Sequence, residues 1–342
     1  MPELRQDRFT KEWVFVASED IKHPHELIVQ RARKPMPSFD PNCPFCPGRE
    51  NHTAPEILRV PSLKGGWTLR VIPRKFTGMT SELPEANSPN AIEGFGIHEL
   101  IVETPDHLLT TALLPETQLL SLFRSAKSRY DEICLDPRIA YATIYKKHAV
   151  EGSGPGHSQS QLIASQVIPP AVASRLQQAR HHYGKTGNCV FCAALQEELD
   201  THSRIVATSA HFIAIEPFAS PSPFCTQIYP RRHMANFGEI NGEELPDFAR
   251  ILRDILGRFY FGLENPDFNY SIRNAPVASA GVNYYHWCLN IVPNLPIPGL
   301  EKEGKMFLNP VLPEEAGAIP AGGSNRASHS GIECPLIADF RK

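Results

Sequence analysis

The 342-residue sequence predicts an α+β fold in which antiparallel strands outnumber helices. Two segments have apolar residues three and four positions apart, as an amphipathic helix requires, and seven shorter runs are typical of strands. Strands and helices do not alternate regularly, which disfavours a doubly wound parallel sheet. The 32 prolines are about twice the usual share of ~5% and favour loops and interrupted strands.

The two helices are predicted over residues 115–134 and 242–262. Leu119 and Phe123 begin the apolar stripe of the first, and Phe248 lies in the stripe of the second. The predicted strands are 98–103, 139–146, 204–207, 212–216, 226–230, 270–273 and 284–292.

Composition excludes two classes of partner. Lys plus Arg number 34 and Asp plus Glu 37, so the net charge of -3 provides no basic field for a nucleic-acid backbone. No apolar run approaches the ~18 residues that would cross a bilayer, which excludes a membrane partner of that kind. The first residues lack the apolar stretch of a secretory signal. We therefore expect a cytoplasmic protein whose eight cysteines do not form disulfides.

One order of features occurs twice along the chain. A Cys-x-x-Cys pair is followed by a histidine, a predicted helix, a strand and a second histidine. This order suggests a duplication. We predict halves at residues 1–170 and 171–315, a linker around 169–187, and a C-terminal tail at 316–342. The first set is Cys43, Cys46, His107 and His157, and the second is Cys189, Cys192, His233 and His286.

These residue types predict metal binding. A structural zinc ion takes four thiolate or imidazole ligands in a tetrahedron, and a Cys-x-x-Cys turn presents two sulfurs to one ion. We therefore predict two Zn²⁺ sites, one in each half. A thioredoxin-like redox pair has the same spacing and is the alternative. It is disfavoured because neither pair is expected between a strand and a long helix.

Several motifs point to one family. In the first half they are Trp13-Val-Phe-Val-Ala, Cys43-Pro-Phe-Cys-Pro-Gly-Arg-Glu50, Gly96-Ile-His-Glu-Leu-Ile-Val-Glu-Thr-Pro-Asp-His107 and His157-Ser-Gln-Ser-Gln161. In the second half they are Gly187-Asn-Cys-Val-Phe-Cys192, Pro230-Arg-Arg-His233, Tyr285-His-Trp287 and Phe307-Leu-Asn-Pro310. Together they resemble the galactose-1-phosphate uridylyltransferase family of the histidine-triad superfamily. The second-half motifs are similar to the plant-type members that act as ADP-glucose phosphorylases.

The resemblance implies two fused histidine-triad-like motifs, nucleotide-sugar substrates and a covalent nucleotidyl-histidine. In the family's His-x-His-x-Gln pattern the first histidine binds zinc, the second attacks the α-phosphorus and the glutamine binds phosphate. Here His157 and Gln161 keep their positions, but Gln159 stands at the nucleophile position. A carboxamide nitrogen has no available lone pair, so Gln159 is expected to bind phosphate without carrying a nucleotidyl group. His148 is the alternative nucleophile.

The same resemblance indicates residues for substrate binding. Arg74 and Lys146 fall where the family has asparagine, and we predict that they supply positive charge to the anion site. The alternative is that both are solvated surface charges. Ser153 and Ser160 complete the predicted substrate-binding set.

The function predicted from these residues is a nucleotidyltransferase of the uridylyltransferase type. It would act on a nucleoside diphosphate sugar with phosphate or hexose phosphate as second substrate, with direct transfer between the bound substrates. A non-catalytic zinc- and nucleotide-binding protein of the same fold is the alternative. Family analogy further suggests a homodimer.

Overall fold

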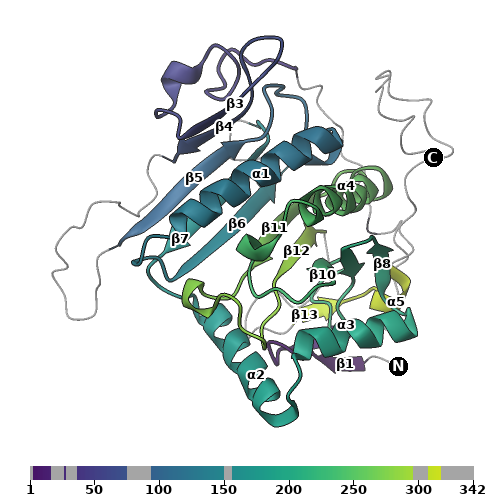
Figure 1. Cartoon of the computed structure of the whole chain (residues 1–342). Helices are drawn as coiled ribbons and strands as arrows, with labels where there is room; N and C mark the ends of the chain where they lie inside the picture. Colours follow the sequence, from purple (N-terminus) through teal and green to yellow (C-terminus); the bar gives the residue numbers. More distant parts are fainter. Residues whose placement is uncertain are drawn as a thin grey trace.

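The computed structural model describes residues 3–16, 27, 37–74, 94–149, 156–295 and 307–316. These residues form a ten-stranded antiparallel sheet, a separate three-stranded sheet and packed helices (Figure 1). The predicted α+β class is confirmed. The large sheet contains β3 (Leu58–Pro61), β4 (Trp67–Pro73), β5 (Gly96–Val102), β6 (Tyr141–His148), β7 (Gln159–Ser165), β8 (Ile205–Thr208), β9 (Phe212–Ile215), β10 (Thr226–Pro230), β11 (Asp267–Arg273) and β12 (Cys288–Asn294).

The order of strands repeats from the two edges of the sheet inwards. It is β3-β4-β5-β7-β6 on one side and β8-β9-β10-β12-β11 on the other, and β6 pairs with β11 where the sides meet. This symmetry supports a duplication. The boundary after residue 170 stays a prediction, because hydrogen bonds join the two sides into one sheet.

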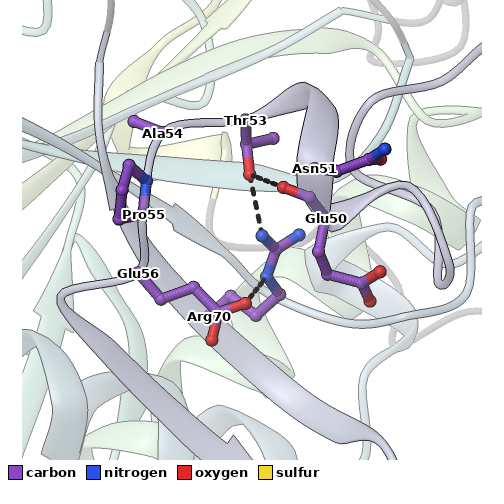
Figure 2. Close-up of a pocket in the computed structure, with 7 residues that line it drawn as sticks. All are labelled: Glu50, Asn51, Thr53, Ala54, Pro55, Glu56 and Arg70. Atoms are coloured by element: carbon purple, nitrogen blue, oxygen red, sulfur yellow. Dashed lines mark hydrogen bonds and ion pairs between the residues drawn. The ribbon is translucent and has the colours of Figure 1, made fainter.

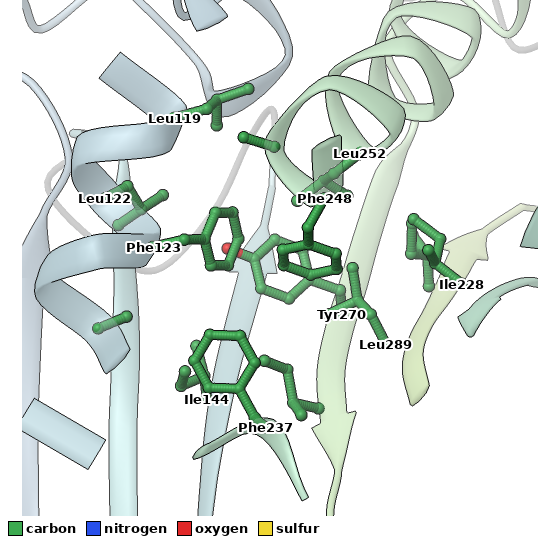
Figure 3. Packing of buried hydrophobic residues seen from close by; sticks show 14 of the residues in the cluster. Leu119, Leu122, Phe123, Ile144, Ile228, Phe237, Phe248, Leu252, Tyr270 and Leu289 are labelled. Carbon is green, nitrogen blue, oxygen red and sulfur yellow. The ribbon is translucent and has the colours of Figure 1, made fainter. Parts of the chain in front are cut away.

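Two helices cover one face of this sheet, and both were predicted. They are α1 (Glu116–Ile133) over the first half and α4 (Glu244–Gly262) over the second (Figure 1). Figure 3 shows their apolar residues meeting above the strands. The rings of Phe123 on α1 and Phe248 on α4 lie edge to face with centroids 4.8 Å apart. One continuous core therefore joins the halves.

The predicted linker at 169–187 is wrong, because this segment is the helix α2 (Pro170–Thr186). A proline in its first turn and Gly187 in the left-handed conformation (φ 72°) mark its ends. It has a weak apolar stripe, with Arg175 and Ala179 as its buried residues. The sequence pattern also missed α3 (Val190–Thr201) and the polar strand β7. The strand predicted over 284–292 begins only at Cys288.

The smaller sheet joins the two ends of the described chain. It contains β1 (Glu3–Gln6), β2 (Trp13–Val16) and β13 (Phe307–Asn309), with β13 parallel to β2. Arg5 donates hydrogen bonds to the carboxylate of Glu314 on α5 (Pro313–Ala316). The predicted tail lies outside the described residues from 317 onwards. The short 3₁₀ helices are Glu50–His52, Thr111–Leu113, Phe237–Glu239 and Val277–Ser279.

Among the helices that the structure describes, none combines the length and apolarity needed to cross a membrane.

We expect Phe248→Ala to lower the free energy of unfolding by about 3–5 kcal/mol, because it removes the fully buried ring between α1 and α4. Leu135→Ala, at a side chain that is 81% exposed, is the control and should change stability by less than about 0.5 kcal/mol. Urea unfolding followed by circular dichroism measures both. Equal losses in the two variants would contradict the packing described above.

Candidate active and metal sites

Strand β7 presents Gln159 and Gln161, the residues predicted at the catalytic positions, on the face of the sheet away from α1. The side chains of Ser160 and Leu162 point towards the helix side of the sheet, where Leu162 belongs to the core. Gln159 and Gln161 point to the opposite side, paired with Val102 and Leu100 of β5. We call this side of β5, β6 and β7 the polar face.

On the polar face, the carbonyl oxygen of Gln161 receives two hydrogen bonds. Arg74 Nη1 donates over 2.9 Å and His98 Nε2 over 2.8 Å. Arg74 is exposed and His98 is half-buried. The side-chain oxygen Oε1 of Gln159 is buried and has no hydrogen-bond partner within the described part of the chain. The side chain of Gln161 is therefore held in place by its neighbours, whereas the side-chain oxygen of Gln159 is left without a described donor.

A buried ion pair lies on the helix side of the same strands. Lys146 Nζ donates to Glu103 Oε1 over 2.9 Å, to Ser158 Oγ over 3.1 Å and to the main-chain carbonyl of Gln159 over 3.1 Å. Ser160 and Ser158 also donate to the Glu103 carboxylate. Burial raises the pKa of Glu103, but the Lys146 ammonium and the hydroxyl donors outweigh it and hold that pKa below its usual value. The carboxylate is therefore ionised and fully bonded.

This network changes the roles predicted for two residues. Lys146 is 1% exposed, so the interpretation of it as a solvated surface charge is wrong. Its ammonium and the Ser160 hydroxyl are already bonded inside the protein, which leaves them no direct path to a ligand in this structure. Arg74 lies on the polar face as a substrate contact would require. Ser153 lies outside the described residues.

His148 lies away from the polar face. Its Nε2 donates to Asn265 Oδ1 over 2.9 Å, and its ring stacks on Phe268 of the core with centroids 4.7 Å apart. Burial lowers the pKa of His148 to about 4. A nucleophile acting beside Gln161 would have to reach through the sheet, so this geometry disfavours His148 in that role.

The first Cys/His set comes together at the start of β7. Cys46 Sγ lies 3.4 Å from His107 Nδ1, and His157 Nδ1 lies 3.6 Å from Cys43 Sγ and 3.8 Å from Cys46 Sγ. All four ligand atoms lie within 4.8 Å of one another, and all four residues are buried. Zinc bonds of about 2.3 Å to sulfur and about 2.05 Å to nitrogen in a tetrahedron place sulfur and nitrogen about 3.6 Å apart. The set fits one zinc ion.

The orientation of His157 supports this fit. Its Nε2 donates to the carbonyl of Thr104 over 2.6 Å, which leaves the Nδ1 lone pair directed at the cysteines. Burial lowers the pKa of His157, so its ring is neutral and able to bind a metal.

The second set is built in the same way. Cys192 Sγ lies 3.2 Å from His233 Nδ1 and 3.4 Å from His286 Nδ1, and His233 Nε2 donates to the carbonyl of Val282 over 3.0 Å. The ligand atoms of Cys189, Cys192 and His233 lie within 4.8 Å of one another. The expectation that this pair does not lie between a strand and a long helix is confirmed, since helix α2 precedes it and Cys189 is the N-cap residue of α3. The redox interpretation remains disfavoured, because α3 follows a helix and two imidazoles face the thiols.

A surface cavity beside the first set contains none of the predicted site residues (Figure 2). Its fully buried Arg70 donates to Glu56 and, over 2.8 Å, to Thr53 Oγ1. Thr53 in turn donates to the carbonyl of Glu50 over 2.8 Å. The guanidinium therefore ties the segment that follows Cys46 to β4, which supports the cysteine turn. The cavity is lined by Glu50, Asn51, Thr53, Ala54, Pro55, Glu56 and Arg70.

Sequence reasoning missed His98, Glu103 and the carbonyl of Thr104. His98 and Glu103 lie within a motif that was recognised, but their roles depend on which strands pair and in which register. The only available signal was the period of two along a strand, which places His98 on the same face as Leu100.

The comparisons place this architecture among the uridylyltransferases. A crystal structure of an ADP-glucose phosphorylase from Arabidopsis thaliana with bound ADP-glucose aligns with a TM-score of 0.79 and 31% identity, over 93% of this chain and 97% of that one. A solved uridylyltransferase aligns with a TM-score of 0.72 and 25% identity, over 93% and 97%. No family model matches the chain.

Sequence relatives agree with this class. The ADP-glucose phosphorylase of Arabidopsis thaliana is 31% identical over 328 residues, which are 93% of this chain and 92% of the relative. The galactose-1-phosphate uridylyltransferase of Thermotoga maritima is 25% identical over 92% of this chain and 96% of its own. The chain belongs to the galactose-1-phosphate uridylyltransferase family.

We expect Lys146→Met to lower the free energy of unfolding by about 3–5 kcal/mol, because it leaves the Glu103 carboxylate buried without its cation. Adding Glu103→Gln removes that charge and should recover part of the loss. Lys64→Met, at an exposed lysine, should change stability by less than about 0.5 kcal/mol. Urea unfolding of the unaltered protein, Lys146→Met, Glu103→Gln and the double variant gives the coupling energy, and a double variant as unstable as the sum of the two singles would refute the ion pair.

Proposed function

We propose that this protein binds a nucleoside diphosphate sugar on the polar face and transfers its nucleotidyl group directly to a phosphate or hexose phosphate acceptor. The observation that carries the proposal is the fixed Gln161 amide with the exposed Arg74 guanidinium beside it. An amide donor and a cation suit the oxygens of a diphosphate. The Arabidopsis relative, solved with ADP-glucose, supports this substrate class.

In the proposed reaction an acceptor oxygen attacks the α-phosphorus of the nucleotide. The bond from that phosphorus to the bridging oxygen breaks, and the leaving group is the sugar 1-phosphate. With inorganic phosphate as the acceptor, the products are a nucleoside diphosphate and a sugar 1-phosphate. This chain's contribution is to position both substrates and stabilise the charge, because the Gln159 amide nitrogen has no available lone pair with which to form a covalent intermediate.

We further propose that both Cys/His sets hold structural zinc. With four protein ligands, such ions leave no open position for a substrate. In the first set the ion would join the loop of Cys43 and Cys46 to His107 after β5 and to His157 before β7. It would thereby fix the end of the strand that carries Gln159 and Gln161.

The glutamine at position 159, where the family has its nucleophilic histidine, also favours a second candidate function. This is a zinc- and nucleotide-binding protein without catalysis. In that case the polar face would bind the same ligand, and no turnover would follow. The predicted homodimer and cytoplasmic location stay predictions.

The Gln159→His variant tests the missing nucleophile. We expect the natural protein incubated with ADP-glucose or UDP-glucose to show no nucleotidyl adduct by intact mass spectrometry, and the variant to gain the mass of one nucleotidyl group. Gln196→His, on the outer surface of α3, is the matched control and should gain nothing. An adduct on the unaltered protein would overturn the direct mechanism. Turnover of either nucleotide sugar by the natural protein separates the transferase from the binding protein.

Metal analysis tests the zinc proposal. We expect close to two zinc ions per chain by plasma mass spectrometry, and the loss of one ion in Cys43→Ser and of the other in Cys189→Ser. Apparent binding energies of structural zinc reach on the order of ~10 kcal/mol, so each variant should also unfold at a lower temperature. Cys134→Ser, outside both sets, is the control and should keep both ions. A folded natural protein with no zinc would contradict the proposal.

A further inference from the structure

The orientation of the Gln161 carboxamide follows from the chemistry of its neighbours. An arginine guanidinium can only donate hydrogen bonds, so the Gln161 atom 2.9 Å from Arg74 Nη1 must be the carbonyl oxygen. His98 Nε2 contacts the same oxygen from 2.8 Å and lies 3.3 Å from Arg74 Nη1. Two donors therefore converge on one acceptor, and the amide nitrogen is turned away from both.

We propose that His98 and Arg74 are positioning residues that fix Gln161 with its NH₂ group towards the ligand, so that the group it contacts must be a hydrogen-bond acceptor. This inference rests on the proposed function for the identity of the ligand, a nucleoside diphosphate sugar, whose phosphate oxygens are such acceptors. The inference gives His98 the role of positioning Gln161. It gives Arg74 the same role, because the Arg74 guanidinium donates to Gln161 in this structure.

The surroundings of the two donors distinguish this arrangement from ordinary packing. His98 is on β5, Arg74 directly follows β4, and the main-chain N–H of Arg74 donates to the carbonyl of His98 over 2.9 Å. That bond extends the pairing of the two strands beyond Pro73 and Glu99, two residues past Leu100, the residue of β5 that is paired with Gln161. The position of both donors is therefore set by the backbone, while the Arg74 side chain is exposed and the His98 side chain is half-buried.

A carboxylate at position 161 would keep both neighbours and lose the donor. In Gln161→Glu the side chain still accepts from Arg74 and His98, with added charge, but it offers the ligand an anionic oxygen in place of NH₂. This variant separates the direction of the hydrogen bond from the integrity of the fold.

The first experiment needs no ligand. In full-length protein with ¹⁵N-labelled glutamine, side-chain NH₂ relaxation measures the mobility of Gln161, assigned by its absence in Gln161→Glu. We expect Gln161 to be rigid in the natural protein and mobile in His98→Ala, with partial rescue by His98→Gln, which restores an N–H donor. Gln118, whose amide donates to two carbonyls at 2.7 and 2.6 Å, should stay rigid throughout. A Gln161 that is equally mobile in all these proteins would overturn the proposal.

The second experiment is calorimetry with ADP-glucose. We expect His98→Ala and Arg74→Ala to weaken binding about five- to tenfold, Gln161→Glu to weaken it by more than about tenfold, and His98→Gln to stay within about twofold of the natural protein. His181→Ala, an exposed histidine on α2, is the control. Unchanged affinity in His98→Ala and Gln161→Glu refutes the positioning role. If the natural protein binds no ADP-glucose, the proposed function fails on that result, and the relaxation measurement still decides the orientation of Gln161.

Discussion

The buried ion pair between Lys146 and Glu103 is the constraint on which the polar face depends. An ammonium and a carboxylate are stable without water only when nearly all of their hydrogen bonds are made, and here β6, β7 with the residue before it, and the loop after β5 supply the partners. One of these bonds goes to the main-chain carbonyl of Gln159. The ion pair on the helix side of the sheet therefore fixes the register of β5, β6 and β7. A shift by one residue would leave both charges unpaired.

Two further interactions fix the same strand from other directions. At its start, His157 faces Cys43 and Cys46 through Nδ1 while its Nε2 is bonded to a main-chain carbonyl. Two residues beyond Gln159, the Gln161 side chain is held from β5 and from the end of β4. Gln159 thus lies between two positions that are each fixed by several bonds, although its own side-chain oxygen has no partner in the described residues.

How far the sequence predicts this arrangement depends on the range of each signal. Helices α1 and α4 were predictable because their stripes face one core, whereas α2 was missed because it buries little more than Arg175 and Ala179. The eight Cys and His residues were identified by type, order and family resemblance, and the structure brings them together in two sets. The burial of Lys146 and the contact of His98 with Gln161 depend on strand pairing, which local sequence does not encode, so a lysine on a predicted strand was read as substrate-binding or solvated.

In the second half, the strand positions that correspond to Gln159 and Gln161 are covered by other parts of the protein. Its sequence His286-Trp-Cys288-Leu-Asn290, which leads into β12, matches the spacing of His157-Ser-Gln159-Ser-Gln161, which leads into β7. Cys288 is 0% and Asn290 4% exposed, and Arg175 from α2 places its guanidinium 3.8 Å from the Cys288 sulfur. There an internal cation and the ring of Phe191 from α3 fill the space beside the strand. The duplication therefore kept a Cys/His set in each half, but only in the first half do the side chains two and four residues after the second histidine reach a partly accessible face. Within the described residues, a ligand that contacts Gln161 therefore finds one such face per chain, the polar face of the first half. We expect binding there.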